Sequence, residues 1–163
     1  MAKASGKQLD IGLNDKQRTG VVDILNAALA NEFVLYTKTR NYHWNVTGPQ
    51  FNDLHKFFDA QYVEIEGFID NTAERARSLG GVAVGSMQGF LKHTTLKEHT
   101  GTPPAAMEMV ADLLGDHETI IRQLRKDIET VSEKHSDEGT ADFLTGTMEA
   151  HEKMAWMLRA FLA

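Results

Sequence analysis

Hydrophobic residues recur every three to four positions along four long stretches of this 163-residue chain. This spacing gathers apolar side chains on one face of a helix, so each stretch predicts an amphipathic helix. The expected helices cover approximately residues 14–43, 50–79, 103–134 and 140–161. Only three prolines occur in the whole chain, and the pattern therefore favours an all-α protein.

Turn-forming residues separate these stretches. A Thr-Gly-Pro sequence at 47–49 and a Gly-Gly pair at 80–81 mark the start and the end of the second helix. Thr102 is expected to cap the third helix, with Pro103 at its first position, where proline is favoured. The segment between the second and third helices is too long for a tight turn and predicts one short helix around 86–94. Four long helices with a long middle crossover make a ferritin-like four-helix bundle, which is the expected fold.

The second helix carries two neighbouring stripes of side chains. The first stripe is apolar and is expected to face the core; it comprises Phe58, Tyr62, Ile65, Ile69 and Leu79. The second consists of histidine and acidic residues at spacings of four, seven, four and four; it comprises His55, Asp59, Glu66, Asp70 and Glu74. Such spacings stack side chains along the helix axis. The second stripe is therefore a line of candidate metal ligands.

The length of the helix prevents these candidates from sharing one metal within a chain. At about 1.5 Å per residue, Asp59 and Asp70 lie roughly 16 Å apart, and His55 and Glu74 roughly 28 Å apart. Both pairs have their midpoint between residues 64 and 65, so an antiparallel copy of the helix, related by a two-fold axis there, sets the members of each pair face to face. Two copies would then form two equivalent sites, each with His55 and Asp59 from one chain and Asp70 and Glu74 from the other.

His43 is a further candidate ligand. It ends the first helix, and the turn that follows can bring it back beside His55 and Asp59. Imidazole and carboxylate donors without sulfur favour iron(II), manganese or zinc over copper(I). Each residue taken alone also has a structural explanation, as a solvated charge or a helix cap. Gly67 lies close to the proposed axis, where it either lets two backbones approach closely or is a tolerated surface glycine.

Three runs of sequence resemble the Dps family, the mini-ferritins named as DNA-binding proteins from starved cells. They are NYHWNVTGPQF at 41–51, LHKFFD at 54–59 and IDNTAERARSLGGVAVG at 69–85. The likeness extends from about Asn31 to the end of the chain and is most specific around 41–85.

The resemblance implies an inter-subunit iron site whose ligands are also the catalytic residues: His43, His55 and Asp59 of one chain, with Asp70 and Glu74 of another. Each position carries the residue that the family motif demands. The implied protein is a ferroxidase that oxidises iron(II) at di-iron sites with hydrogen peroxide or, more slowly, dioxygen. It would store ferric mineral in a hollow dodecamer and so protect DNA from oxidative damage.

Two further features take a meaning from the same resemblance. A tryptophan at the position of Trp44 adjoins the iron site in the Dps family and can be oxidised there in place of DNA; the alternative is an aromatic plug beside the turn. Asp137, Glu138 and Asp142 correspond to acidic residues that line a cation pore between three subunits, where negative potential would concentrate iron(II). Capping and the helix dipole also predict acidic residues at a helix N-terminus, and the two interpretations are compatible.

Composition and charge limit the partners. The chain is 42% hydrophobic and 25% charged, as globular proteins are, and it has no cysteine for disulfides or thiolate metal sites. It shows no signal peptide and no run of about 18 apolar residues, which predicts a cytoplasmic protein that does not enter a membrane.

The net charge of −6 disfavours DNA binding through the body of the protein. Residues 1–12 are expected to form a flexible tail before the bundle domain at 13–163, and Lys3 and Lys7 are its candidate DNA contacts; a purely solubilising tail is the alternative.

Other functions make different demands on the sequence. A larger ferritin or bacterioferritin holds its di-iron site inside each bundle with Glu-x-x-His pairs, and no such pair occurs here. A nucleoid-compacting DNA-binding protein with minor iron chemistry predicts a basic tail, and a plain helical scaffold leaves the shared midpoints unexplained.

Among the remaining histidines, His117 follows an apolar stripe and is expected in the core or an interface, whereas His93 and His99 are expected at the surface.

Overall fold

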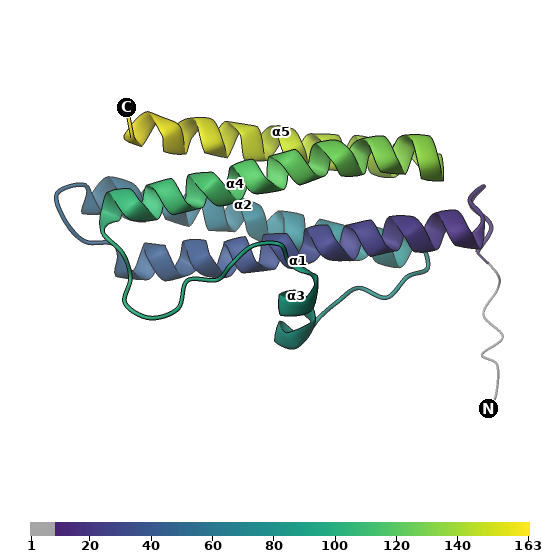
Figure 1. The fold of residues 1–163 in the computed structure, drawn as a ribbon, viewed down its shortest axis with the longest axis horizontal. Helices are drawn as coiled ribbons and strands as arrows, with labels where there is room; N and C mark the ends of the chain where they lie inside the picture. Colours follow the sequence, from purple (N-terminus) through teal and green to yellow (C-terminus); the bar gives the residue numbers. More distant parts are fainter. Residues whose placement is uncertain (1–8) are drawn as a thin grey trace.

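Helices and their connections make up residues 9–163, the part of the chain that this computed structural model describes. Four long helices lie side by side in a bundle (Figure 1). The helical elements are α1 Asp15–Asn45, α2 Phe51–Ser78, α3 Met87–His93, α4 Ala106–Glu129, the π-helix η1 Thr130–Lys134 and α5 Glu138–Phe161. The predicted all-α, ferritin-like four-helix bundle, with a short helix in the long crossover, is confirmed. Residues 1–8, with Lys3 and Lys7, lie outside the described part.

The long helices form two antiparallel pairs. A short turn at 46–50 joins α1 to α2, and η1 with a bend at 135–137 joins α4 to α5; the contacts within these pairs are the most extensive in the chain. The crossover at 79–105 carries α3, which lies against α1 on the outside of the bundle (Figure 1). The end of α1 and the start of α2, which carry His43 and His55, therefore lie together at one end of the molecule.

The buried face of α2 is rotated slightly from the predicted apolar stripe. Its buried side chains are Leu54, Phe58, Gln61, Ile65, Thr72 and Ala76. Tyr62 and Ile69, which the pattern placed in the core, are only partly buried because they lie at the edge of this face. Tyr62 is thereby free to contact residues of the candidate metal centre.

Asn14 caps α1, as one of the two residues predicted for that position. Its Oδ1 accepts the backbone N–H of Gln17 at 3.0 Å, while the Asn14 N–H donates to Gln17 Oε1 at 2.9 Å. This reciprocal capping box satisfies two backbone donors that the first turn leaves free. At its other end α1 runs past His43 to Asn45, so Trp44 belongs to the helix.

The predicted start of the third long helix is wrong. α4 begins at Ala106 rather than at Pro103, and the backbone N–H of Ala105 donates to Glu108 Oε2 at 2.9 Å. The physical reason lies in the double proline, because Pro104 disfavours the helical conformation of the residue before it. Thr102 therefore lies in the crossover and caps no helix.

The junction of α4 and α5 depends on a close contact with α1. η1 ends the α4 side, His135 is buried, and Ser136 adopts a positive φ of 55° before α5 begins. The His135 ring lies so close to Gly20 of α1 that a Cβ at position 20 would be 2.1 Å from the ring Cε1 atom. Only glycine leaves room for this imidazole.

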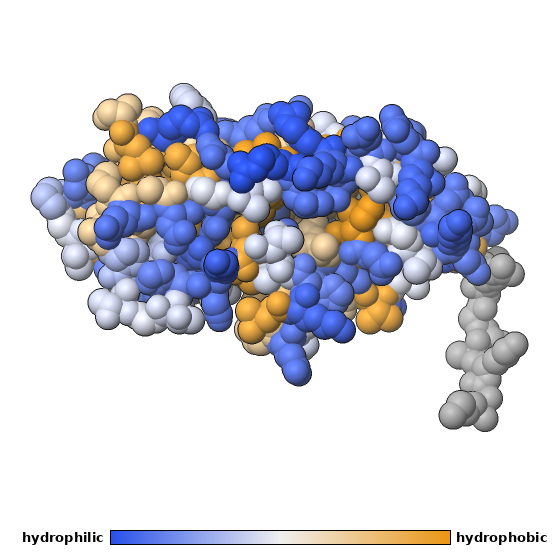
Figure 2. All heavy atoms as spheres, in the orientation of Figure 1, coloured by the Kyte–Doolittle hydropathy of each residue, from blue (hydrophilic) through white to orange (hydrophobic). Residues whose placement is uncertain are grey.

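The surface seen in Figure 2 is mostly hydrophilic, with apolar residues gathered near the C-terminal end of the bundle and around α3. Exposed apolar side chains in these regions include Met87 and Leu91 of α3 and Trp156, Met157 and Leu162 near the C-terminus. No helix in the described residues is both long enough and apolar enough to cross a membrane.

Candidate metal centre

The turn between α1 and α2 brings His43 and His55 into direct contact. Their imidazole rings are stacked, with centroids 3.8 Å apart and planes inclined by 19°. Both side chains are partly buried. Two of the predicted ligands, separated by twelve positions in sequence, are thus neighbours within one chain.

Reciprocal hydrogen bonds fix which nitrogen of each ring carries the proton. His43 Nδ1 lies 2.8 Å from the His55 carbonyl oxygen, and His55 Nδ1 lies 2.9 Å from the His43 carbonyl oxygen. A carbonyl can only accept a hydrogen bond, so both Nδ1 atoms donate. The His43 carbonyl belongs to the last turn of α1, where the helix itself provides no partner. With Nδ1 as the donor, the neutral form of each ring has its lone pair on Nε2, and this is the form in which imidazole binds a metal.

Asp59 extends this pair by one helical turn. It lies exposed on α2, four residues after His55, and the Tyr62 hydroxyl donates a hydrogen bond to its Oδ1. This bond to a carboxylate is the main reason that the pKa of Tyr62 is raised, and the phenol stays a donor at neutral pH. The Tyr62 ring also meets the His43 ring edge to face, with centroids 5.3 Å apart.

A single cation organises the aromatic residues around the pair. The guanidinium carbon of Arg40 lies 4.9 Å from the ring centroid of Tyr62, 5.2 Å from that of Trp44 and 5.4 Å from that of Tyr36. Its Nη1 donates to the Tyr36 hydroxyl at 2.5 Å. Trp44 is 64% exposed, so within the single chain it covers Arg40 rather than filling the core.

Asp70 and Glu74 lie on the exposed side of α2, farther along the helix. Within residues 9–163 no three His, Asp or Glu side chains of one chain form a group that could hold a metal ion. The fold therefore brings His43 and His55 together, with Asp59 one turn away, and leaves Asp70 and Glu74 apart from them. The five predicted ligands can therefore meet at one point only if a second copy of the chain supplies Asp70 and Glu74.

Known proteins share both the sequence and this fold. A family model described as a ferritin-like domain matches residues 22–163. A DNA protection during starvation protein from Brevibacillus brevis is 42% identical over 142 residues, which cover 87% of this chain and 94% of that protein. The chain belongs to the Dps family.

Two other proteins show how closely this Dps-family chain follows its relatives. An uncharacterized low temperature-induced protein of Nostoc sp. is 51% identical over 155 residues, covering 95% of this chain and 87% of that one. The crystal structure of a Dps protein from Vibrio cholerae, described as a member of a broad superfamily of ferritin-like diiron-carboxylate proteins, superposes with a TM-score of 0.89. It is 33% identical, and the match covers 99% of this chain and 100% of that chain.

The three acidic residues assigned to a pore differ in their surroundings in this Dps-family fold. Asp137 is buried as the N-cap of α5, where it accepts hydrogen bonds from the backbone and hydroxyl of Thr140 and pairs with Arg75 at 3.1 Å. Glu138 and Asp142 are exposed. The capping role of Asp137 is thus observed, and the pore lined by Asp137, Glu138 and Asp142 stays a prediction.

Sequence reasoning missed a buried chain of polar side chains across the bundle of this Dps-family protein. His151 Nε2 lies 2.9 Å from Glu32 Oε1, and His151 Nδ1 lies 2.9 Å from His117 Nδ1. All three side chains are at most 2% exposed. Burial first, and then the charge of His151, lowers the pKa of His117 well below its ordinary value. His117 is therefore a neutral core histidine, as its apolar stripe predicted.

This buried chain lies in the interior of the bundle, where a larger ferritin holds its metal site. His151 uses one ring nitrogen toward Glu32 and the other toward His117, so it has no lone pair left for a metal. The three side chains form a line of hydrogen bonds and do not converge on one point. The sequence signal was the position of both histidines on apolar faces, but their pairing depends on how distant helices pack.

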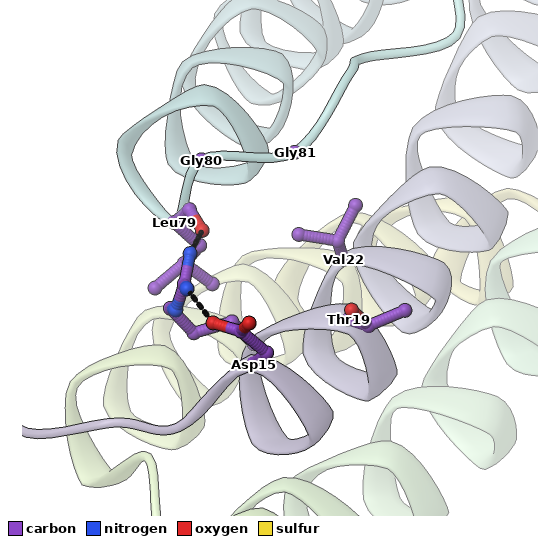
Figure 3. A pocket seen from close by; sticks show the side chains of 7 residues that line it. Asp15, Thr19, Val22, Leu79, Gly80 and Gly81 are labelled. Atoms are coloured by element: carbon purple, nitrogen blue, oxygen red, sulfur yellow. Dashed lines mark hydrogen bonds and ion pairs between the residues drawn. The ribbon is translucent and has the colours of Figure 1, made fainter. Parts of the chain in front are cut away.

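A pocket at the opposite end of α1 is separate from the metal centre (Figure 3). It has a volume of about 310 Å³ and is lined by Asp15, Arg18, Thr19, Val22, Leu79, Gly80 and Gly81. The Arg18 guanidinium pairs with Asp15 and donates to the Leu79 carbonyl at 3.2 Å. The two charged residues that line this pocket, Asp15 and Arg18, thus pair with each other.

Proposed function

We propose that the protein oxidises iron(II) at sites shared by two-fold-related copies and stores the ferric product in a hollow dodecamer. The single observation that supports this most is the reciprocal hydrogen bonding of His43 and His55. Because both Nδ1 atoms are hydrogen-bonded to carbonyl oxygens, only the Nε2 atom of each ring remains to bind a metal. Membership of the Dps family supports the iron chemistry and the closed assembly.

Each proposed site combines side chains of two chains. His43, His55 and Asp59 come from one copy, and Asp70 and Glu74 come from the second copy across the axis near residues 64 and 65. Neutral imidazoles suit iron(II), while carboxylates favour the higher charge of iron(III). The donor set therefore binds the substrate ion and also stabilises its oxidised form.

The proposed reaction consumes two iron(II) ions for each hydrogen peroxide. Each ion gives up one electron, the oxygen–oxygen bond breaks, and two protons complete two water molecules, leaving two iron(III) ions. Because both electrons are supplied together, no hydroxyl radical is released. Dioxygen is the slower alternative oxidant. The protein holds the two ions side by side and neutralises their charge with carboxylates.

Protection of DNA follows from this chemistry without contact between protein and DNA. The Brevibacillus brevis relative is named for DNA protection during starvation, whereas the net charge of this chain is −6. Removing iron(II) and peroxide together suppresses the radicals that damage DNA. A nucleoid-compacting role would instead depend on Lys3 and Lys7, which lie outside the described residues.

The first test is iron(II) oxidation by the assembled wild type, His55→Ala and Asp70→Ala, with either peroxide or dioxygen. We expect both variants to lose at least about tenfold in initial rate, because even groups that only support a metal ligand are worth about 10- to 100-fold. Glu64→Ala, another exposed carboxylate on α2, is the matched control and should keep the wild-type rate.

Mixing the two inactive variants distinguishes a shared site from two separate ones. After subunit exchange, a dimer with one copy of each variant has one site that lacks both residues and one site that keeps every ligand. Partial recovery of activity is therefore expected. Wild-type rates in both single variants, with circular dichroism unchanged, would overturn the metal assignment.

A further inference from the structure

We infer that Tyr62 is a positioning residue of the iron site, acting through Asp59 and His43. This inference rests on the proposed function, because it concerns how two of the proposed ligands are held. Tyr62 was expected from its apolar stripe to be a core residue. In the structure its hydroxyl and its ring each contact a different candidate ligand.

The hydroxyl of Tyr62 restricts Asp59. Asp59 lies on the exposed side of α2, where an unpaired carboxylate exchanges freely among rotamers, and fixing it has an entropic cost. The bond from Tyr62 to Oδ1 holds the carboxylate in one orientation before a metal arrives. Among the described residues the hydrogen bond to Asp59 goes to Oδ1, so Oδ2 remains available to a cation.

The ring of Tyr62 restricts His43 from a second side. The His55 ring is stacked on the His43 imidazole at 3.8 Å, and the Tyr62 ring meets it at 5.3 Å with planes inclined by 75°. Edge-to-face contacts of this kind have a preferred geometry. Together with the hydrogen bond to the His55 carbonyl, they leave His43 little freedom to turn its Nε2 away.

Tyr62 is itself held by residues of α1. The Arg40 guanidinium carbon lies 4.9 Å from the Tyr62 ring centroid, within the range of a cation–π interaction. The Tyr36 ring meets the Tyr62 ring at 6.1 Å with an interplanar angle of 88°, and the Tyr36 hydroxyl accepts from Arg40. The Arg40 guanidinium and the aromatic ring of Tyr36 both contact the Tyr62 ring and are therefore well placed to keep Tyr62 against both ligands.

Replacing Tyr62 with phenylalanine isolates the hydroxyl. The variant keeps the ring, its contact with His43 and its place beneath Arg40, and it loses only the bond to Asp59. Groups that orient metal ligands typically account for about 10- to 100-fold in metal affinity or activity. We expect Tyr62→Phe to weaken metal binding by that factor while the unfolding temperature stays unchanged.

Cobalt(II) is a suitable probe because its visible bands report its ligands and it allows binding to be measured without oxidation. The assembled wild type, Tyr62→Phe, Tyr36→Phe and Asp59→Asn would be titrated with cobalt(II) without oxygen. Tyr36→Phe keeps the ring that contacts Tyr62 and removes only a hydroxyl, whose hydrogen-bond partners are Glu66 and Arg40 rather than Asp59, so it is the matched control. Weaker binding and altered bands are expected in Tyr62→Phe and not in Tyr36→Phe.

The outcomes separate this inference from the proposed function. If the wild type binds cobalt(II), Asp59→Asn loses it and Tyr62→Phe binds as the wild type does, the role of Tyr62 is refuted and the iron site stands. If Asp59→Asn binds cobalt(II) as tightly as the wild type, the proposed iron site is refuted, and the proposed role of Tyr62 is refuted together with it. Equal weakening in Tyr62→Phe and Tyr36→Phe would show a general effect of the aromatic cluster and contradict a specific action through Asp59.

Discussion

At the scale of single residues, the function of each histidine follows from what its ring nitrogens bind. His43 and His55 donate from Nδ1 to carbonyl oxygens and keep Nε2 free, so they can bind a cation. His151 has both nitrogens engaged, and His117 is confined to the core by burial. Histidines that look alike in sequence are thus divided between a candidate metal centre and a structural role.

The buried His117 predicts that acid destabilises the protein. Its pKa is lowered well below the ordinary 6.5, so below about pH 6.5 the unfolded chain binds a proton that the folded chain does not. Stability from this group is complete above pH 6.5 and is lost as the pH falls toward the depressed pKa. The expected loss is up to about 1.4 kcal/mol per pH unit in each chain.

The measurement is the free energy of unfolding at pH 7.5 and 5.5, at one protein concentration, for the wild type and His117→Gln. The side-chain amide of glutamine contains both a donor and an acceptor and can still hydrogen-bond to His151, but it does not titrate. Burial raises the pKa of Asp116 and Asp127 above 3.8, which acts in the opposite direction at lower pH and is common to both proteins. The same pH dependence in both would show that His117 is not its source.

At the scale of helices, close contacts between elements decide details that local patterns leave open. The bend between α4 and α5 places the His135 ring against Gly20 of α1. The ion pair between Arg75 of α2 and Asp137 connects the start of α5 to α2. These contacts set where the exposed Glu138 and Asp142 lie. A glycine inside α1 is therefore required by packing and not by its backbone conformation.

Adding a methyl group at position 20 tests this contact. Gly20→Ala should destabilise the protein by about 1–3 kcal/mol, since the His135 ring must move within a packed region. Gly115 of α4 is the control, because a Cβ there meets nothing within 4 Å, and Gly115→Ala should stabilise by about 0.5–1 kcal/mol through helix propensity. Thermal unfolding of both variants measures the difference, and similar shifts in both would refute the packing argument.

Sequence patterns predicted the parts of this fold that depend on local periodicity. Four long helices, the α3 segment, the Asn14 cap and the meeting of His43 with His55 all follow from spacing and turn residues. The start of α4 was missed because two adjacent prolines outweigh the usual preference for proline at a helix start. The role of Tyr62 and the pairing of His117 with His151 were missed because both depend on side chains from distant helices.

At the scale of the whole molecule, one chain holds only part of the proposed site. His43 of α1 and His55 of α2 are in contact within the chain, while Asp70 and Glu74 are exposed farther along α2. A two-fold axis near the middle of α2 would complete two sites at once, and closed symmetry would enclose space for mineral. The proposed activity therefore depends on assembly of several copies of the chain.

The assembly has a definite expected mass. Twelve chains of 18.2 kDa give a particle of 12 × 18.2 = 218 kDa, which sedimentation can distinguish from a dimer. Iron loading with peroxide should raise its mass and leave its outer radius unchanged, because mineral fills the interior. A particle that stays dimeric while oxidising iron would retain the shared site and contradict the storage cage.

The most direct test of the shared site is a crystal structure of the protein loaded anaerobically with iron(II), with the metal located by anomalous scattering. We expect iron bonded to Nε2 of His43 and of His55, with both Nδ1 atoms still donating to carbonyl oxygens and with carboxylates of a second copy completing the site. Iron held within one bundle beside Glu32 and His151, or bound without any ligand from a second chain, would contradict this expectation.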